Sequence, residues 1–336
     1  MKSIAIVILN HNGKQYLEKF LPKVIQHSPD CDIVVADNFS GDDSLDYLQQ
    51  TFPAIMVMKF DRNYGFCGGY NKALFQLNYD IFVLLNSDIE VTEGWMKPIK
   101  QMFDGDDTIA AIQPKLLDYN LKTKFEYAGG AGGYLDKFGY PFCRGRIFDS
   151  IETDEGQYND SREIFWASGA ALCIRGDLFK SYQGFDNDFF AHMEEIDLCW
   201  RMKKDGRKIM FCADSVIYHV GGGTLSYSNP TKTYLNFRNS LLVLIKNLPS
   251  SELVWKVIIR VLLDYVAALK FAFTGQIRDA MMVIKAHFYI LRNLKRNLNK
   301  RPSNKNSHAR VTEIYPKSLL FSYHIARVRK FSNLGF

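Results

Sequence analysis

Apolar runs alternate with amphipathic segments through the first hundred residues, and this alternation restricts the fold more than any other feature. The run SIAIVIL at 3–9 is rich in β-branched residues, as expected for a strand buried on both faces. Alternation of strands and helices predicts a parallel sheet covered by helices on both faces. The further strands are predicted at 32–37, 55–60 and 79–86, and the helices at 13–27, 42–52, 68–78 and 93–103.

Polar residues follow each of these predicted strands. Ligands of parallel sheets bind beyond the carboxyl ends of the strands, so these residues are candidates for a binding site. They are Asn10 and His11, Asp37 and Asn38, Asp61 to Asn63, and Asn86 to Asp88.

The pattern changes in the middle of the chain. Residues 125–146 are rich in glycine and aromatic residues and have no helical period, which predicts short strands and loops. Residues 149–163 are polar and acidic, so we predict a surface loop. Strands are predicted again at 164–175 and 208–219, with a helix between them that carries an acidic cluster.

Residues 249–336 form a tail that differs in character from residues 1–248. Polar residues recur every four positions in the helix predicted to begin near Pro249, which leaves a narrow polar stripe and a wide apolar face. The stripe consists of Glu252, Lys256, Arg260 and Asp264. We therefore predict two domains, 1–248 and 249–336.

A basic segment follows that helix. No acid lies between Asp279 and Glu313, while lysine and arginine recur from Lys285 to Arg310. An amphipathic helix followed by a basic stretch is typical of a segment that lies on an anionic membrane surface. The alternative is that the helix packs on the main domain or on a partner subunit.

The composition indicates in which cellular compartment the protein is found. The six cysteines show no C-x-x-C spacing, and a chain of 336 residues does not need disulfides, so free thiols in a reducing cytosol are expected. We find no signal peptide and no apolar stretch long enough to span a bilayer. The predicted location is cytoplasmic, with peripheral contact to the inner face of the membrane. The net charge of +6 is mild, and no nucleic-acid partner is expected.

Three acids lie close together in FFAHMEEIDLCWRMKKDG, residues 189–206. Asp197 can pair with Arg201 one turn later. On a helix Glu194 shares a face with Asp197, and Glu195 is expected to point elsewhere. One glutamate in this apolar setting is then available as a general base. A solvated acidic helix face is the alternative.

Asp88 and His219 are candidate metal ligands. Asp88 follows an apolar strand with Asn86 two residues before it, and such oxygen ligands suit a divalent cation. His219 ends a strand before a glycine run that can form a closing loop. A turn or N-cap aspartate and a structural histidine are the plainer interpretations.

Two further segments suit a nucleotide. Asp37 can accept from a pyrimidine imide or from ribose hydroxyls, and the alternative is a helix N-cap. The glycine-bearing turn DRNYGFCGGYN opens a helix whose N-terminal amides favour phosphate, and a plain tight turn is the alternative.

These segments together resemble the family 2 glycosyltransferases, and most closely the rhamnosyltransferase-like branch of bacterial surface-polysaccharide enzymes. The resemblance covers about the first two-thirds of the chain. Its motifs here are DNFSGDDS, NYGFCGGYN, NSD, ASGAALCIR, EEIDLCWR and HVGGGT. The resemblance implies a glycosyltransferase A-type α/β fold, a Rossmann-like and mostly parallel sheet flanked by helices, with a C-terminal helical extension.

The resemblance also implies roles for individual residues. Glu195 falls at the family's catalytic base, as glutamate rather than aspartate, or Glu194 fills this role. Asp88 and His219 correspond to metal ligands, and Asn86 replaces the first aspartate of the D-x-D motif. The residues predicted to bind the nucleotide sugar are Asn10, Asp37, Asn38, Asn63, Gly65, Asn71, Asn86, Ser168 and Gly169.

The implied reaction is an inverting, metal-dependent transfer of a sugar from a nucleoside-diphosphate sugar to a saccharide acceptor, which can be lipid-linked. Mg²⁺ or Mn²⁺ would offset the charge of the leaving diphosphate. Two alternatives remain: a sugar nucleotidyltransferase, which would need more basic residues after the first strand, and a catalytically silent relative, which Asn86 favours.

Overall fold

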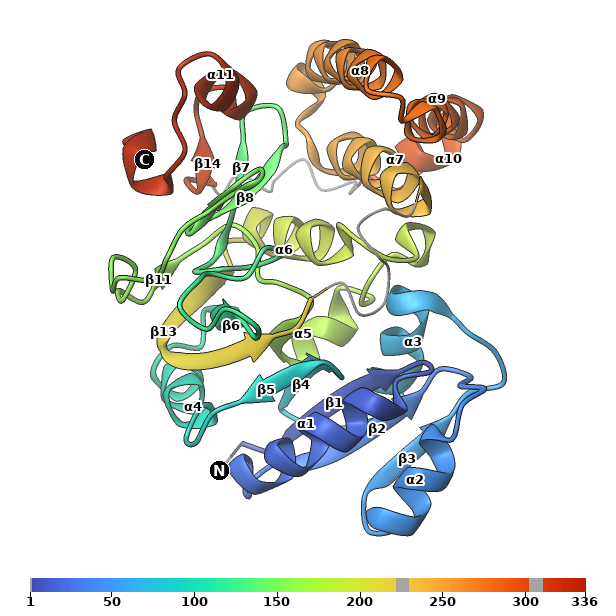
Figure 1. The fold of residues 1–336 in the computed structure, drawn as a ribbon, viewed down its shortest axis with the longest axis vertical. Coiled ribbons are helices and arrows are strands. Elements are labelled where there is room, and N and C mark those ends of the chain that lie inside the picture. Colours follow the sequence, from blue (N-terminus) through green and yellow to red (C-terminus); the bar gives the residue numbers. More distant parts are fainter. Residues whose placement is uncertain (1, 222–229, 302–310) are drawn as a thin grey trace.

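The computed structural model describes residues 2–221, 230–301 and 311–336, and it follows the predicted alternation through the first hundred residues (Figure 1). Apart from differences at the ends, every strand and helix expected in this part is present. The strands are β1 (Ile4–Asn10), β2 (Asp32–Asp37), β3 (Met56–Lys59), β4 (Ile81–Asn86) and β5 (Ile89–Val91). The helices are α1 (Lys14–His27), α2 (Ser44–Thr51), α3 (Gly65–Leu74) and α4 (Met96–Gly105).

The main sheet has the strand order β11-β13-β6-β12-β4-β1-β2-β3, and β5 pairs with β13. The added strands are β6 (Ile109–Asp118), β11 (Arg162–Glu163), β12 (Ala171–Arg175) and β13 (Lys208–His219). The half from β4 to β3 is parallel, while β12 runs antiparallel to both β4 and β6. The sheet is therefore mostly parallel on one side and mixed on the other.

Both faces of the main sheet are buried, as the continuous apolar run of β1 predicts. Ile6 and Ile8 belong to a core cluster with Leu17 of α1. Ala5 and Val7 belong to the opposite cluster, which contains apolar residues of α3 and α6. Alternate side chains of one strand thus fill two cores.

The strand predicted at 164–175 is shorter than expected and covers only β12. Residues before Ala171 donate their amides to separate partners, and a continuous ladder is therefore impossible. Ile164 donates to Ile209 O, Phe165 to Gly133 O, and Ser168 to Gln113 Oε1.

A second, smaller sheet has the order β10-β9-β8-β7-β14. Its strands are β7 (Gly133–Asp136), β8 (Pro141–Cys143), β9 (Arg146–Ile147), β10 (Ser150–Ile151) and β14 (Ile314–Tyr315). The short strands predicted at 125–146 are thus confirmed, and the segment predicted as a surface loop contributes β10 and β11. The last segment of the chain returns to this sheet, because β14 pairs in parallel with β7.

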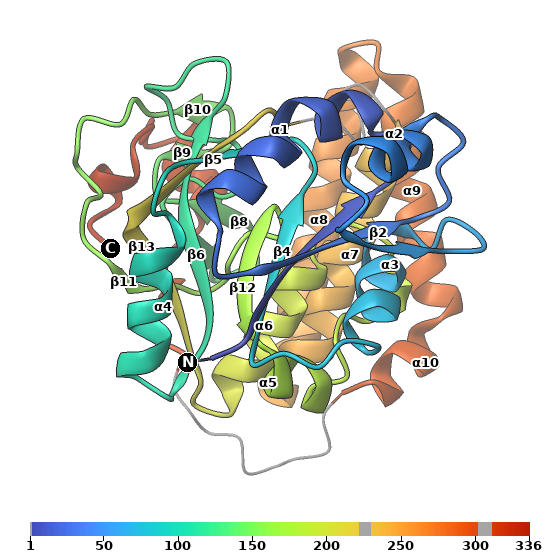
Figure 2. The same ribbon diagram turned by 90° about the horizontal axis from the view of Figure 1, so that it is seen from below.

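Helices form the remainder, and Figures 1 and 2 place α7 to α10 together beside α6. The helices before and within this group are α5 (Gly176–Ser181), η1 (Asn187–Phe189), α6 (Glu194–Lys204), α7 (Pro230–Asn247), α8 (Ser250–Phe273), α9 (Ile277–Arg292) and α10 (Leu294–Asn299). The chain ends with α11 (Leu319–His324) and η2 (Phe331–Leu334). No helix in the described ranges combines the length and apolar character needed to cross a bilayer.

Helix α8 packs with its polar stripe inward. Arg260 is 4% exposed and Asp264 is 0% exposed. Arg260 Nε donates to Asp264 Oδ1 at 3.1 Å, and Arg260 Nη2 donates to Ser240 Oγ of α7 at 3.0 Å. His287 of α9 lies 3.2 Å from Asp264 Oδ2. The predicted amphipathic helix is present, and its packed side is the polar one.

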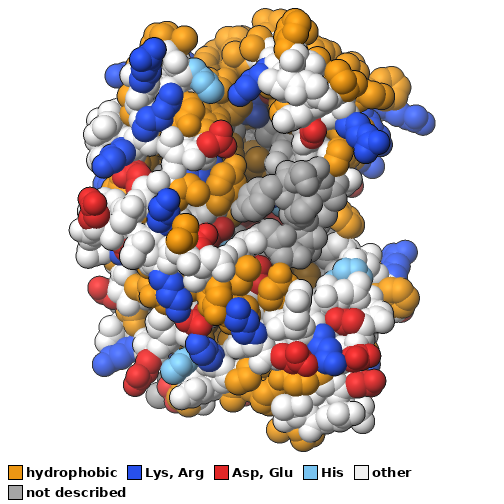
Figure 3. All heavy atoms as spheres, viewed as in Figure 1, with side chains coloured by type: hydrophobic (Ala, Val, Ile, Leu, Met, Phe, Trp, Pro, Cys, Tyr) orange, Lys and Arg blue, Asp and Glu red, His pale blue; other side chains and the backbone are white. Residues whose placement is uncertain are grey.

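The apolar side of α8 and its neighbour α9 faces outward. Figure 3 shows hydrophobic side chains gathered along the upper edge of the molecule, over these helices. We call this set the outer apolar face. Its exposed residues are Val254, Trp255, Ile258, Leu262, Tyr265, Val266, Leu269 and Phe273 of α8, and Ile277, Met281, Ile284, Phe288 and Leu291 of α9.

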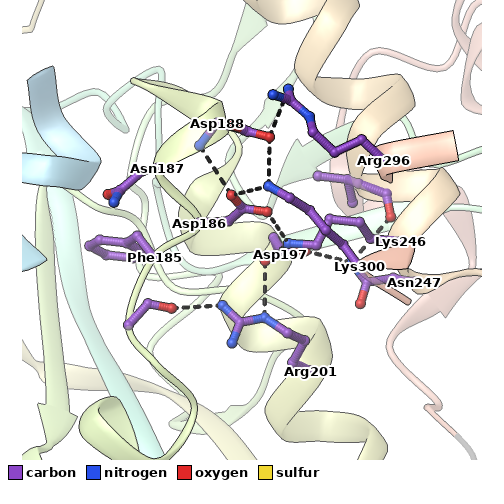
Figure 4. A network of polar contacts seen from close by, with 12 residues as sticks. Phe185, Asp186, Asn187, Asp188, Asp197, Arg201, Lys246, Asn247, Arg296 and Lys300 are labelled. Atoms are coloured by element: carbon purple, nitrogen blue, oxygen red, sulfur yellow. Dashed lines mark hydrogen bonds and ion pairs between the residues drawn. The ribbon is translucent and has the colours of Figure 1, made fainter. Parts of the chain in front are cut away.

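A polar network ties this helical group to the loop before α6 (Figure 4). Lys246 of α7 donates to Asp186 Oδ2 at 2.7 Å and to Asp197 Oδ2 at 2.9 Å. Lys300 donates to Asp186 Oδ1 at 2.7 Å and to Asp188 Oδ2 at 2.6 Å. Groups on both sides of the predicted boundary at 248 therefore hold the same loop.

Candidate active site

A cavity of about 1860 Å³ opens beyond the carboxyl ends of the parallel strands. It extends from the ends of β1 and β4, past the N-terminus of α6, to α8 and α11. Most of the residues predicted to form the site line it. They are Asn38, Asn63, Gly65, Asn86, Asp88, Ser168, Gly169, Glu194, Glu195 and His219.

Glu194 and Glu195 begin α6, and both face this cavity. Their Oε2 atoms are buried and make no hydrogen bond with any described residue. Burial raises the pKa of Glu195 to about 7, although nearby backbone amides oppose the shift. Burial and then Glu195 raise the pKa of Glu194 well above its ordinary value. A carboxyl group with a pKa near neutrality and a free oxygen suits proton transfer.

The prediction that Glu194 shares a helix face with Asp197, and that Glu195 points elsewhere, was wrong. Glu194 and Glu195 both line the cavity, whereas Asp197 is fully buried beside α7. The predicted ion pair is present, with Arg201 Nε donating to Asp197 Oδ2 at 3.0 Å. Burial alone would raise the pKa of Asp197, but Arg201 and Lys246 lower it overall. Asp197 therefore anchors the helix that carries the two glutamates.

The turn before α6 is strained and held from α7. Phe190, His192 and Met193 have φ of 65°, 70° and 72°, a region that side-chain-bearing residues rarely adopt. Asn239 Nδ2 donates to the carbonyls of Phe189, Ala191 and His192 at 3.0, 2.8 and 2.7 Å. Such strain persists only where surrounding contacts impose it, and it is common at active sites.

Asp88 and His219 come together because β5 pairs with the end of β13, with His219 opposite Ile89. His219 Nε2 lies 3.1 Å from Asp88 Oδ1, and His219 Nδ1 lies 3.2 Å from Glu126 Oε1. Burial lowers the pKa of His219, but Glu126 and Asp88 outweigh it and raise the pKa to about 10. Two buried acids around one imidazole make this part of the cavity favourable for a cation.

The fit of this arrangement to a divalent metal rests on two ligands. Across the described residues, no group of three or more His, Cys, Asp and Glu side chains is arranged to hold a metal. Nevertheless, a 3.1 Å separation allows Asp88 Oδ1 and His219 Nε2 to bind one ion together, with Asn86 Nδ2 3.5 Å from the same nitrogen. A carboxylate on the other ring nitrogen, here Glu126, is the usual means of orienting a metal-binding histidine.

The glycine run predicted to close over the site lies mostly outside the described residues, which resume at residue 230. The same applies to Lys305 and Arg310 of the basic segment.

Asn38, Asn63 and Gly65 shape the cavity wall. Asn38 Nδ2 donates to Asn63 Oδ1 and to Gly65 O, both at 3.0 Å. Gly65 has φ of 68°, and a Cβ there would lie 2.6 Å from the Phe190 ring. The amides of Phe66 and Cys67 donate to Phe190 O, so the first turn of α3 is already occupied by protein acceptors.

Three residues predicted to bind the donor are engaged within the protein. Asn10 Nδ2 donates to Asp37 Oδ2 at 3.1 Å, and Asp37 Oδ1 accepts from the amide of Ser40 at 3.0 Å. Asn71 donates to Phe185 O at 2.7 Å and accepts from the Phe185 amide at 2.9 Å. Their roles toward a ligand stay predictions.

Ser168 and Gly169 form the wall next to the glutamates. Gln113 Oε1 accepts from the Ser168 amide at 2.8 Å, which fixes this turn to β6. A Cβ at Gly169 would lie 3.1 Å from the Phe66 ring and 3.9 Å from Glu194 Oε1. A residue without a side chain here keeps space beside the glutamates.

Sequence reasoning missed Glu126, Arg146 and His192, which also line the cavity. Glu126 and Arg146 lie within the irregular segment 125–146. This segment has no periodic pattern that would indicate which side chains point inward. His192 lies two residues before Glu194, and its place within the acidic segment is the one signal available. Burial and then Lys232 lower its pKa to about 4, so His192 is neutral beside the glutamates.

Comparison with known proteins defines the class. The structure resembles that of GalNAc-T7 with UDP, GalNAc and Mn²⁺, with a TM-score of 0.57 and 17% identity over 73% of this chain and 48% of that chain. This likeness confirms the predicted glycosyltransferase A-type fold. The fold is therefore that of the A-type glycosyltransferases.

The sequence comparisons support the same family as the motifs. Residues 5–151 match the model described as glycosyl transferase family 2. It is 21% identical to the low-salt glycan biosynthesis hexosyltransferase Agl10 of Haloferax volcanii, over 72% of this chain and 75% of the relative. It is also 21% identical to the N-acetylglucosaminyl-diphospho-decaprenol L-rhamnosyltransferase of Mycobacterium tuberculosis, over 64% of this chain and 75% of the relative.

Proposed function

We propose that the protein transfers a sugar from a nucleoside-diphosphate sugar to a hydroxyl group of a saccharide acceptor in the biosynthesis of a cell-surface polysaccharide. The observation that carries this proposal is the pair of glutamates at the start of α6. Glu195 has a free, buried carboxylate oxygen and a pKa raised to about 7, and it shares a cavity with Asp88 and His219. The names of both relatives, a hexosyltransferase and a rhamnosyltransferase, support the same class of reaction.

The donor is placed over the carboxyl ends of β1, β2 and β4. Asn38, Asn63 and Gly65 line this part of the cavity, and Asp88 and His219 lie where the diphosphate of the donor would end. These last two residues would hold Mg²⁺ or Mn²⁺, with Glu126 orienting the His219 ring. When bound, the ion supplies positive charge that stabilises the departing nucleoside diphosphate.

Glu195 is the proposed base. It removes the proton from the acceptor hydroxyl while that oxygen forms a bond to the anomeric carbon of the donor. The bond between this carbon and the diphosphate oxygen breaks, and its electron pair leaves with the nucleoside diphosphate. Attack from the side opposite the leaving group inverts the configuration. Glu194 is the alternative base, because it lines the same cavity and is equally without a partner for its Oε2 atom.

The tail is the proposed membrane-contacting part, residues 249–336. The outer apolar face carries large side chains, with Phe288 64% exposed and Phe273 89% exposed. The acids of α8 and α9 are engaged within the protein: Asp264 is fully buried, Asp279 accepts from Thr233, and Glu252 pairs with Lys256. Exposed cations surround the face, including Lys270, Lys285 and Arg292. An apolar helical face with a basic border matches the interface of an anionic bilayer, where a lipid-linked acceptor resides.

Release of nucleoside diphosphate from a panel of uridine, thymidine and guanosine diphosphate sugars, with Mn²⁺ present, tests the proposal. We expect release with at least one donor, and loss of release in Asp88→Asn with an unchanged melting temperature. Exposed Asp43→Asn is the control and should keep full activity. Binding of nucleotide sugars without any release would instead indicate a silent relative, and formation of diphosphate from a nucleoside triphosphate and a sugar phosphate would indicate a nucleotidyltransferase.

A further inference from the structure

Arg146 is a buried cation without a counter-charge. It lies in β9, is 7% exposed and lines the cavity. Within the described ranges it forms no ion pair, and its Nε has no hydrogen-bond partner. Its remaining polar contacts are weak, at 3.5 Å from Nη1 to Phe148 O and 3.7 Å from Nη2 to Cys143 Sγ. An unpaired buried charge is strongly unfavourable, so this position suggests an absent anion.

Other buried cations among the described residues have better partners. Arg260 pairs with Asp264, and Lys246 pairs with Asp186 and Asp197. Arg238 has no ion pair in the described ranges, but its Nη2 donates to the carbonyls of Asp188 and Phe189 at 2.9 and 2.8 Å. Glu126 is close enough to act on Arg146 electrostatically, but its Oε1 faces His219 and its Oε2 accepts from the amide of Ala128 at 2.6 Å. Both carboxylate oxygens of Glu126 therefore have other partners, and the guanidinium group of Arg146 stays available to a ligand in the cavity.

Arg146 lies between the candidate catalytic centre and the tail. On one side its guanidinium rests 4.4 Å from the ring centre of Tyr127, whose chain neighbour Glu126 contacts His219. On the other side it donates to the backbone of Phe148, whose ring lies 5.0 Å from that of Tyr323 in α11. Arg146 therefore lies on the wall that connects the surroundings of His219 to α11.

The cavity beyond Arg146 has largely apolar walls, although Arg260, Lys270, Lys317 and His324 also line it. Its walls come from two helices that are far apart in the sequence, α8 and α11, and Figure 1 shows them facing each other across the top of the molecule. The wall residues include Ile259, Leu263 and Val266 of α8, Leu320 and Phe321 of α11, and Ile325 directly after α11. This end of the cavity is continuous with the outer apolar face, because Val266 belongs to both.

We propose that Arg146 binds the phosphate of a lipid-linked acceptor and that the hydrocarbon chain of this lipid lies between α8 and α11. The inference rests on the proposed function. One molecule then satisfies three parts of the cavity in order: a sugar hydroxyl at Glu195, a phosphate at Arg146 and a hydrocarbon chain in the apolar end. A guanidinium is suited to this task because its fixed N–H groups match two phosphate oxygens.

The probe is farnesyl diphosphate, a short isoprenyl diphosphate, and its binding to the full-length protein is measured by calorimetry. We expect Arg146→Met to weaken binding by about 10- to 100-fold, as for loss of a charged hydrogen-bonding group. Arg146→Lys should lose less, because it keeps the charge. Exposed Arg162→Met is the matched control and should bind as the wild type does, and melting temperatures establish that all variants fold.

Two further measurements separate the parts of the proposal. Val266→Asp should weaken farnesyl diphosphate and leave inorganic diphosphate unchanged, because only the first carries a hydrocarbon chain. Binding of UDP and GDP with Mn²⁺ should be the same in Arg146→Met and the wild type.

Equal affinity of Arg146→Met and the wild type for farnesyl diphosphate would overturn the phosphate site. A parallel loss of nucleotide binding in Arg146→Met would assign the arginine to the donor instead. If inorganic diphosphate binds as tightly as farnesyl diphosphate, the hydrocarbon site is overturned. Donor cleavage is measured independently, so failure here leaves the proposed glycosyl transfer untouched.

Discussion

The main sheet and the helices α8 and α9 are built with opposite polarity. In the sheet, apolar side chains such as Ile6 and Val83 are fully buried between two layers of helices. In the helical pair, the buried positions hold Arg260, Asp264 and His287 beside smaller apolar residues such as Ala268 and Val283, while Leu262 and Phe288 are exposed at 60% and 64%. The apolar residues of the main sheet are therefore buried within the protein, whereas many of those on α8 and α9 are exposed.

The difference indicates two surroundings. Burial of apolar area contributes about 25 cal/mol per Å² to stability in water. The main sheet gains this contribution on both of its faces. A buried ion pair contributes little by comparison, so an inward polar stripe is a poor way to stabilise a helix in water. Contiguous exposed apolar surface usually marks an interaction site. We infer that the sheet is built for water and that α8 and α9 are built for a lipid interface.

Loss of the proposed base should give the largest effect. Glu195→Gln keeps the size of the side chain and removes its basicity, so transfer should fall about 10²–10⁴-fold while nucleotide-sugar binding survives. Glu194→Gln should be milder. Both variants are assayed for transfer rate, donor affinity and melting temperature. A dead Glu194→Gln with a near-normal Glu195→Gln would move the base by one residue, and activity in both would remove the base from α6.

The inward polar stripe gives the next largest effect. Asp264→Ala leaves Arg260 and His287 buried without their carboxylate, so the free energy of unfolding should fall by about 3–5 kcal/mol. Leu262→Ala on the outer side of the same helix should change it by less than about 0.5 kcal/mol. Denaturant unfolding in detergent-free buffer measures both. A larger loss for Leu262→Ala would reverse the assigned orientation of α8.

Membrane contact should depend on the outer apolar face. Phe288→Glu should reduce flotation with phosphatidylglycerol–phosphatidylcholine vesicles more than tenfold, because it removes about 2 kcal/mol of apolar burial and adds repulsion. Wild-type binding should also weaken as salt increases. Met56→Glu, at a 50% exposed position on β3, is the matched control. Equal flotation of both variants would refute the assignment.

The smallest effect expected is a dependence on pH that comes from the unpaired carboxyl group of Glu195. Deprotonated Glu195 is the base, and its pKa is raised to about 7, so kcat/KM should rise with pH and level off above about 7. Because the folded pKa lies above the unfolded value of 4.5, folding stability should fall between these values and stay constant above 7. The expected loss of folding stability is about 1–3 kcal/mol, and Glu195→Gln should abolish it. A pH-independent difference between the two proteins would contradict the assignment.

The sequence predicted β1 to β4 well, because continuous β-branched runs separated by helical periods have few other solutions. Asp88 and His219 were found as a pair through their motifs. Glu126 was not found, because its contact with His219 depends on β13 running beside β6, and nothing in the local sequence reports that pairing. A helical period likewise shows that α8 has two unlike faces but does not show which one packs. The orientation follows only from Ser240 and His287, which lie on other helices.

The pairing of β14 with β7 has a consequence for synthesis. The sheet that carries Arg146 and one wall of the cavity gains its outermost strand from residues 314–315, near the end of the chain. A nascent chain can form the parallel strands early, yet this wall stays incomplete until residues 314–315 have been synthesised. A product truncated after Leu248 would keep the proposed nucleotide-binding part and lack part of the proposed acceptor site, so we do not expect it to be a complete enzyme. The order of translation thereby couples completion of the proposed acceptor site to the synthesis of the helices proposed to contact the membrane.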